Sequence, residues 1–104
     1  MSEYDLYYNL ILESIKKIEK TDICSISDDL VWDATLMRLQ VIGESVGDIP
    51  NDIKKRFDFL NWNKLERLRN LISHKYAMVP PEIIREIIAN DLPKLKQAII
   101  KLKK

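Results

Sequence analysis

Apolar residues recur at three- and four-residue steps along most of the chain, which is the pattern of helices that bury one face. The first such segment runs from about Tyr4 to Lys20, and charged residues lie mostly on its other face. The apolar face of this segment comprises Tyr4, Tyr7, Tyr8, Ile11, Ile15 and Ile18. The spacing predicts a helix over this segment.

A second helix is predicted from Ser27 or Asp28 to about Val46. Either Ser27 or Asp28 can cap it, because a side-chain oxygen there accepts an unpaired backbone N–H. One apolar stripe comprises Leu36, Leu39, Gly43 and Val46, and a second beside it comprises Ala34, Met37 and Val41. So wide a face suits a helix with several neighbours, or one that also meets a second subunit. Gly43 costs about 1 kcal/mol relative to alanine in a helix, and close approach of another helix would compensate.

The second half of the chain predicts further helices. Residues 51–59 favour a short helical turn, and Asn61 can cap a helix that starts at Trp62 and buries Leu65, Leu68 and Ile72. The Val79-Pro80-Pro81 segment stops that helix, and another follows from about Pro81. The long stripe of this last helix comprises Ile84, Ile88, Leu92, Leu95, Ile99 and Leu102. Asp91 can cap a fresh helical start, so a kink or break is expected before Pro93.

The fold expected from these segments is an all-α bundle of four to five helices in a single domain, residues 1–104. Only two glycines and four prolines occur in 104 residues, which favours helices over a many-stranded sheet. Neither an internal repeat nor a long linker interrupts the pattern. We therefore expect short connections between neighbouring helices.

Composition excludes several classes of protein. Seventeen basic and sixteen acidic residues give a net charge of +1, so attraction for nucleic acid must come from local placement of charge. One cysteine and one histidine exclude a Cys/His metal cage within one chain, and no metal or cofactor is expected. Neither a secretory signal nor an apolar run long enough to span a membrane is present, so a cytoplasmic location is expected.

The helix from Trp62 carries the residues best suited to chemistry. His74 can take and give a proton near neutral pH, and Arg69 can hold a phosphate through its planar fork of donors. Asn70 can orient a phosphate or the imidazole, and Tyr76 adds a hydroxyl and an aromatic face. These groups suit metal-independent cleavage of RNA, in which the ribose 2′-hydroxyl attacks the adjacent phosphorus. DNA lacks that hydroxyl and would not be a substrate.

The spacing of these residues points to a second subunit. Five residues along a helix correspond to about 500° of rotation, which leaves Arg69 and His74 about 140° apart, whereas Asn70 and His74 share a face. Two copies related by a two-fold axis would bring Arg69 and His74 of both chains together. The residues alone also allow a structural interpretation, in which His74 packs or caps and Arg69 is a solvated charge.

The segment from Arg69 to Tyr76, with the sequence RNLISHKY, resembles the Arg-x4-His-x-Tyr signature of the HepT-like HEPN proteins. The resemblance extends to residues 41–44 (VIGE), to Trp62 with Leu65 and Leu68, and to residues 90–95 (NDLPKL). It covers most of the chain in order and at comparable spacing.

The resemblance implies a helical bundle that forms two-fold dimers with the motif at the subunit cleft. Such proteins are typically ribonuclease toxins encoded beside a nucleotidyltransferase antitoxin, MntA, which uses ATP and a divalent metal to transfer AMP to the motif tyrosine. Carried over, Arg69 and His74 are catalytic, Asn70 supports them and Tyr76 is the site of modification.

Two other interpretations stay open. The chain could be a non-catalytic helical partner that presents substrate or nucleotide to a minimal nucleotidyltransferase, or a plain interaction domain with an accidental motif. Arg69 and His74 together favour the enzyme, because a binding subunit has no evident need for that pair.

Overall fold

The computed structural model describes residues 4–21 and 28–103, which form helices and turns and contain no strand. The α-helices are α1 (Asp5–Glu19), α2 (Asp29–Gly47), α3 (Asn51–Lys54), α4 (Trp62–Lys75), α5 (Pro81–Glu86) and α6 (Leu92–Leu102). Two 3₁₀-helices, η2 (Lys55–Phe57) and η3 (Tyr76–Met78), and one π-helix, η4 (Ile87–Asp91), complete the order. The described part of the chain is therefore all-α, as predicted.

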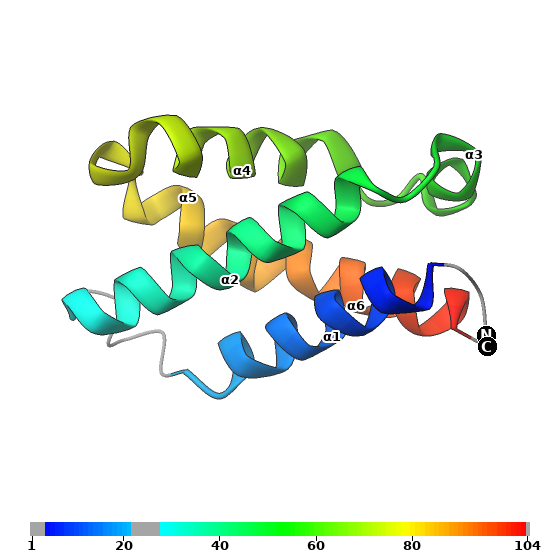
Figure 1. Ribbon diagram of the computed structural model, residues 1–104, viewed down its shortest axis with the longest axis horizontal. Coiled ribbons are helices and arrows are strands. Elements are labelled where there is room, and N and C mark those ends of the chain that lie inside the picture. Colours follow the sequence, from blue (N-terminus) through cyan, green and yellow to red (C-terminus); the bar gives the residue numbers. More distant parts are fainter. Residues whose placement is uncertain (1–3, 22–27, 104) are drawn as a thin grey trace.

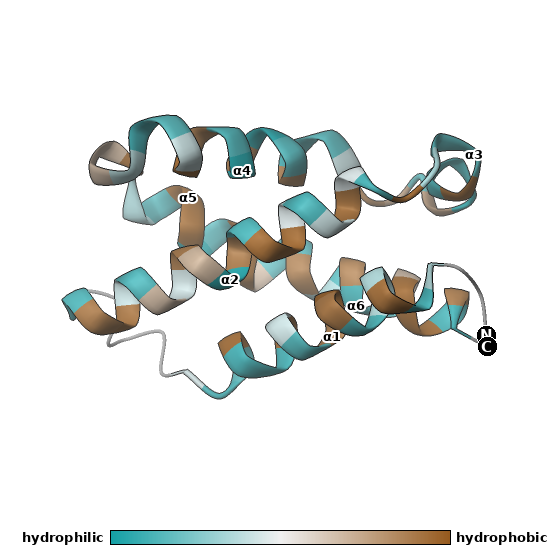
Figure 2. Ribbon diagram, in the orientation of Figure 1, coloured by the Kyte–Doolittle hydropathy of each residue, from teal (hydrophilic) through white to brown (hydrophobic). Residues whose placement is uncertain are grey.

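Helix α2 lies at the centre of the bundle. It packs mainly against α4 and α1, and α1 also contacts α6. Figure 1 shows α4 along one side of α2, with α1 and α6 along the other. Hydrophobic positions interrupt the polar surface of each of these helices at regular intervals (Figure 2). In α1 the buried apolar residues are Tyr8, Ile11, Ile15 and Ile18, which confirms most of the predicted face; Tyr4 and Tyr7 are half-buried.

Helix α2 begins with a side-chain cap at Asp28. One carboxylate oxygen of Asp28 accepts the backbone N–H of Leu30 at 2.9 Å and that of Val31 at 3.2 Å. The alternative cap, Ser27, lies outside the described residues. The first apolar stripe, from Leu36 to Val46, is buried as predicted.

The second stripe of α2 is not covered within the chain. Met37 is 58% exposed, Ala34 is exposed and Val41 is half-buried. Leu30, one turn before Ala34, is 80% exposed. The wide apolar face was expected to meet either several helices of the same chain or a second subunit. Helices of the same chain do not cover this stripe.

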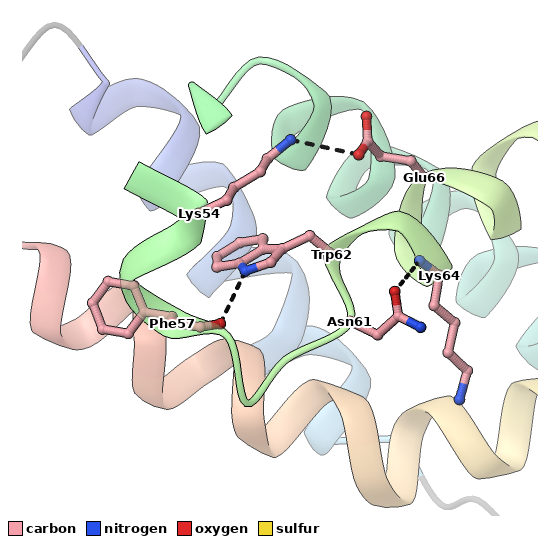
Figure 3. Close-up of polar contacts among 6 residues, drawn as sticks. All are labelled: Lys54, Phe57, Asn61, Trp62, Lys64 and Glu66. Carbon is pink, nitrogen blue, oxygen red and sulfur yellow. Dashed lines mark hydrogen bonds and ion pairs between the residues drawn. The ribbon is translucent and has the colours of Figure 1, made fainter. Parts of the chain in front are cut away.

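Helix α4 is anchored at its start by Trp62. The Trp62 ring is buried, and its indole N–H donates to the carbonyl oxygen of Phe57 at 3.1 Å (Figure 3). Asn61 caps the helix, since its side-chain oxygen accepts the backbone N–H of Lys64 at 3.1 Å. The face that comprises Leu65, Leu68 and Ile72 is buried, which confirms the prediction for this helix.

The expected break before Pro93 takes the form of a π-helix. Pro93 has no N–H to donate one turn back, and the backbone N–H of Leu92 instead donates to the carbonyl oxygen of Ile87. The prediction that Asp91 caps a new helix is wrong, because its side chain makes no capping hydrogen bond. Asp91 is buried and forms an ion pair with Lys64, with 2.8 Å between its Oδ2 and the Lys64 Nζ.

Candidate active site

Helices α2 and α4 approach most closely at Gly43. A Cβ atom built on Gly43 would lie 2.5 Å from the Cβ of Arg69 and 3.0 Å from the backbone oxygen of Leu65. No side chain larger than hydrogen fits there without a shift of one helix. The expected close approach of another helix at Gly43 is confirmed, and it fixes the position of Arg69 on α4.

The guanidinium of Arg69 turns toward Asn70. Its Nη1 donates to the side-chain oxygen of Asn70 at 2.8 Å. Among the described residues Arg69 forms no ion pair with a carboxylate, so its charge is not neutralised within the chain. Asn70 lies one helical turn before His74, so the charged end of Arg69 is held on the side of α4 that carries Asn70.

A pocket of about 290 Å³ lies beside Arg69 and Asn70 between the two helices. Its other lining residues are Gly43, Glu44, Gly47, Asp48 and Glu66. Three of these carry carboxylates, and Glu66 is paired with Lys54 at 3.5 Å. The pocket brings together two of the four predicted site residues; His74 and Tyr76 do not line it.

His74 lies in the last turn of α4 and is exposed. Its side chain makes no hydrogen bond or ion pair with any part of the chain that the structure describes. The structural interpretation of His74 as a packed or capping residue therefore does not apply within one chain. Its imidazole is free to meet a ligand or another subunit.

Tyr76 follows at the point where α4 ends. The backbone leaves the helix at Lys75 (φ −135°, ψ 36°), and Tyr76 begins η3. Its ring is 45% exposed, in agreement with the accessibility expected for a residue before the Val79-Pro80-Pro81 turn. The Tyr76 hydroxyl donates a short hydrogen bond to Oδ1 of Asp33 on α2. This bond is the main cause that raises the pKa of Tyr76, because ionisation would place a phenolate beside a carboxylate.

Sequence reasoning missed Asp33. It lies 43 residues before Tyr76, and nothing in the spacing or composition connects the two. Only the crossing of α2 with the end of α4 brings this carboxylate to the tyrosine.

The comparison with known proteins decides the family. The sequence model of the family described as "Ribonuclease HepT-like" matches residues 6–102. The chain belongs to the HepT-like ribonuclease family. A "Probable ribonuclease HepT" of Thermococcus cleftensis is 31% identical, and the alignment covers 94% of each chain.

Two further relatives come from Methanocaldococcus jannaschii. One, named "Putative RNase", is 29% identical and aligns over 88% of this chain and 82% of its own length. The other, named "Gamma-glutamylcyclotransferase and putative RNase", is 30% identical over 93% of this chain. This chain spans only 46% of that relative's length. No solved structure matches the chain significantly.

The described part of the chain offers neither a metal-binding cluster nor a membrane-spanning helix. Within residues 4–21 and 28–103, no group of three or more His, Cys, Asp or Glu side chains is arranged to hold a metal ion. In the same residues, no helix combines the length and the apolar composition needed to cross a membrane.

Proposed function

We propose that this chain is a metal-independent endoribonuclease toxin of the HEPN/MNT toxin–antitoxin type. Arg69 and His74 are its catalytic residues, and Asn70 supports them. A partner nucleotidyltransferase of the MntA kind neutralises the nuclease by transferring AMP from ATP to Tyr76. RNA is the substrate, and the reaction takes place in a homodimer.

One observation carries the nuclease proposal: a HepT-like helix ends in an unpartnered His74, one turn after the amide that holds Arg69. The imidazole can take the proton of the 2′-hydroxyl or return one to the leaving 5′-oxygen. The Arg69 guanidinium, which forms no ion pair among the described residues, can offset the negative charge that develops on the phosphoryl oxygens. A residue kept only for structure has no need to be left both titratable and unpaired.

The exposed stripe of α2 supports the dimer. Leu30, Ala34, Met37 and Val41 recur at three- and four-residue steps and are not fully covered within the chain. A second copy packed on this stripe would bury it. The same α2 lies beside α4, so a two-fold axis there would place two copies of Arg69 and His74 along one cleft. In light scattering, wild type should then have the mass of a dimer and Met37→Asp that of a monomer. Equal masses of the two proteins would contradict this interface.

The exposure of Tyr76 supports its role as the modified residue. Of the four tyrosines, Tyr8 is buried, and Tyr4 and Tyr7 are half-buried. An AMP group on Tyr76 would add a negative phosphate and a bulky base two residues from His74. It would repel the RNA backbone and occupy space that the substrate needs.

Purified protein incubated with single-stranded RNA in excess chelator tests the nuclease proposal. Wild type should cut the RNA and leave a DNA of the same sequence intact, because the attacking 2′-hydroxyl is absent from DNA. The fragments should carry 2′,3′-cyclic phosphate ends, visible by mass spectrometry. Intact RNA, together with a stable complex between this chain and the transferase, would instead favour the non-catalytic binding partner.

A further inference from the structure

Asp33 and Tyr76 form an exposed pair at the crossing of α2 with the end of α4. The hydroxyl of Tyr76 donates its proton to Oδ1 of Asp33, and both side chains are accessible to solvent. Asp33 lies on the exposed side of α2, one turn after Asp29, whereas Tyr76 reaches it from the first residue of η3. A macromolecule can approach this pair without unfolding any part of the chain.

The geometry of the bond matters for the reactivity of the tyrosine. A phenol has one proton and two lone pairs on its oxygen. Asp33 engages the proton, so the lone pairs stay available for attack on an electrophile. The carboxylate also fixes the direction of the C–O–H group and thus the direction from which an electrophile can approach.

The pKa of Tyr76 explains why a proton acceptor is needed. The hydrogen bond to Asp33, followed by burial, raises the pKa of Tyr76 above the usual value of 10.0. Very little phenolate is therefore present near neutral pH. The proton must leave as the new bond forms, which is the situation in which a positioned base accelerates a reaction. Protein kinases use an aspartate in this way on the hydroxyl that receives phosphate.

Resting on the function proposed above, we infer that Asp33 is the proton acceptor for the modification of Tyr76. In this step the Tyr76 Oη forms a bond to the α-phosphorus of ATP. The bond between that phosphorus and the oxygen bridging to the β-phosphate breaks, and pyrophosphate leaves with the electron pair. The phenolic proton passes to the Asp33 carboxylate and from there to solvent. The products are O-AMP-tyrosine, pyrophosphate and one proton.

The transferase would thus supply the nucleotide, the metal and the phosphate contacts, whereas this chain supplies both the nucleophile and its base. Few other ionisable groups lie near the pair along the chain. Within one helical turn they are Asp29 on α2 and His74 and Lys75 on α4. Tyr76 and Tyr8 also differ in their surroundings. Tyr8 is in the core, and burial is the main cause that raises its pKa.

The test compares Asp33→Asn with a matched control, Asp29→Asn, which removes the same charge one turn away on the same helix. Each variant is incubated with the transferase encoded beside its gene, ATP and Mg²⁺, and AMP on Tyr76 is quantified by peptide mass spectrometry. We expect Asp33→Asn to slow the modification by at least about a hundredfold, the lower end of general-base effects. Asp29→Asn and wild type should react at similar rates. Asp33→Glu should recover part of the rate.

The pH dependence separates proton transfer from a merely structural role. Wild type should vary little in rate between about pH 6 and 9, because Asp33 accepts the proton from the neutral phenol as the new bond forms. Asp33→Asn should react through the small phenolate fraction, so its rate should rise about tenfold per pH unit. A structural defect would lower the rate without creating this slope. RNA cleavage by unmodified Asp33→Asn should equal that of wild type.

Two results would overturn the inference, and only the second also contradicts the proposed modification of Tyr76. If wild type carries AMP on Tyr76 while Asp33→Asn reacts as fast or faster with a flat pH profile, Asp33 is not the acceptor, and the proposed function survives. If wild type acquires AMP on Tyr4, Tyr7 or Tyr8, or none at all, both the assignment of Tyr76 and the inference are wrong. Thermal unfolding of each variant, measured alongside, excludes a loss of fold as the cause.

Discussion

The two ends of α4 use polar residues in opposite ways. At the start of the helix several polar side chains are engaged, and Figure 3 shows the Asn61 cap and the pair of Glu66 with Lys54. Lys54 pairs with Glu66 at 3.5 Å, and Lys64 pairs with Glu86 at 2.7 Å and with Asp91 at 2.8 Å. These contacts tie α3 and the α5–α6 arm to α4.

At the other end of α4 the polar groups are left open. Arg69 is held only by the neutral amide of Asn70, His74 has no partner among the described residues, and Tyr76 is bound by Asp33 alone. Charged and titratable groups that are neither neutralised nor buried contribute little to stability. The polar residues at the start of α4 therefore hold the fold together, whereas those at its end are available to a ligand or partner outside the chain.

His74→Ala tests most directly whether the two ends of α4 differ in this way. Loss of a positioned proton-transfer group should lower RNA cleavage by 10²–10⁴-fold, on the order of 3–5 kcal/mol of barrier. Stability should stay within about 0.5 kcal/mol of wild type, because the side chain is exposed and unpaired. Single-turnover cleavage and urea unfolding measure the two quantities.

Lys64→Ala is the matched change at the other end of α4. It leaves the buried Asp91 without its cation, so stability should fall by about 1–3 kcal/mol while the folded fraction cleaves RNA normally.

If His74→Ala unfolds the protein, or cleaves as wild type does, the division between the two ends is wrong. Arg69→Ala should resemble His74→Ala in activity.

A second prediction concerns the crossing that positions Arg69. Gly43→Ala should destabilise the protein by about 1–3 kcal/mol, because its methyl group would meet the Cβ of Arg69 at 2.5 Å. This is the net effect, since the clash outweighs the gain of about 1 kcal/mol that alanine brings in helix propensity. Cleavage should fall as well, since Arg69 must shift. Urea unfolding and the RNA assay on the same preparation measure both effects.

Gly47→Ala is the control for Gly43→Ala. Its methyl group would lie 3.4 Å from Oε1 of Glu66, which is an ordinary contact. The protein should be as stable as wild type or slightly more so, with unchanged cleavage. Equal stability of the two variants would show that the helices can separate at little cost.

A third prediction separates the two carboxylates that meet Lys64. Asp91→Asn should lower stability by about 1–3 kcal/mol, because the Asp91 side chain is only 10% exposed and the ion pair is shielded from water. Glu86→Gln should cost less than about 1 kcal/mol, since that side chain is 57% exposed. Chemical denaturation midpoints provide the comparison. A larger loss for Glu86→Gln would mean that burial does not determine the strength of these pairs.

The smallest expected effect is a loss of stability at alkaline pH. The hydrogen bonds to Asp91, first, and Glu86 raise the pKa of Lys64 above its value in the unfolded chain. The stabilisation is therefore fully present below the unfolded pKa of about 10.4 and disappears as pH rises through the folded pKa. Its size should be below about 1 kcal/mol.

Lys64→Arg isolates this contribution, because arginine stays charged at higher pH and the raised pKa of Tyr8 affects both proteins alike. The variant should match wild type in urea near pH 9 and exceed it near pH 11. Parallel losses of stability in both proteins would assign the alkaline effect to other groups.

Local sequence patterns predicted the helices of this protein. The spacing of apolar residues gave each helix and most of its buried face, because amphipathic periodicity is a local property of the chain. Asp28, Asn61 and the Pro80-Pro81 pair marked helix ends through contacts made within a few residues. The Arg-x4-His-x-Tyr segment likewise singled out Arg69, His74 and Tyr76 without any knowledge of their surroundings.

The contacts between those helices depend on residues far apart in the sequence, and they became visible in the folded chain. The bond from Tyr76 to Asp33 spans 43 residues, and the ion pair that makes Asp91 a packing residue instead of a helix cap spans 27 residues, from 64 to 91. Periodicity tells which face of a helix is apolar but not what covers it, so the sequence left open whether the second stripe of α2 meets neighbours in the chain or a second subunit. The crossing at Gly43 set the angle between α2 and α4, and that angle brought a carboxylate to the tyrosine while leaving His74 open.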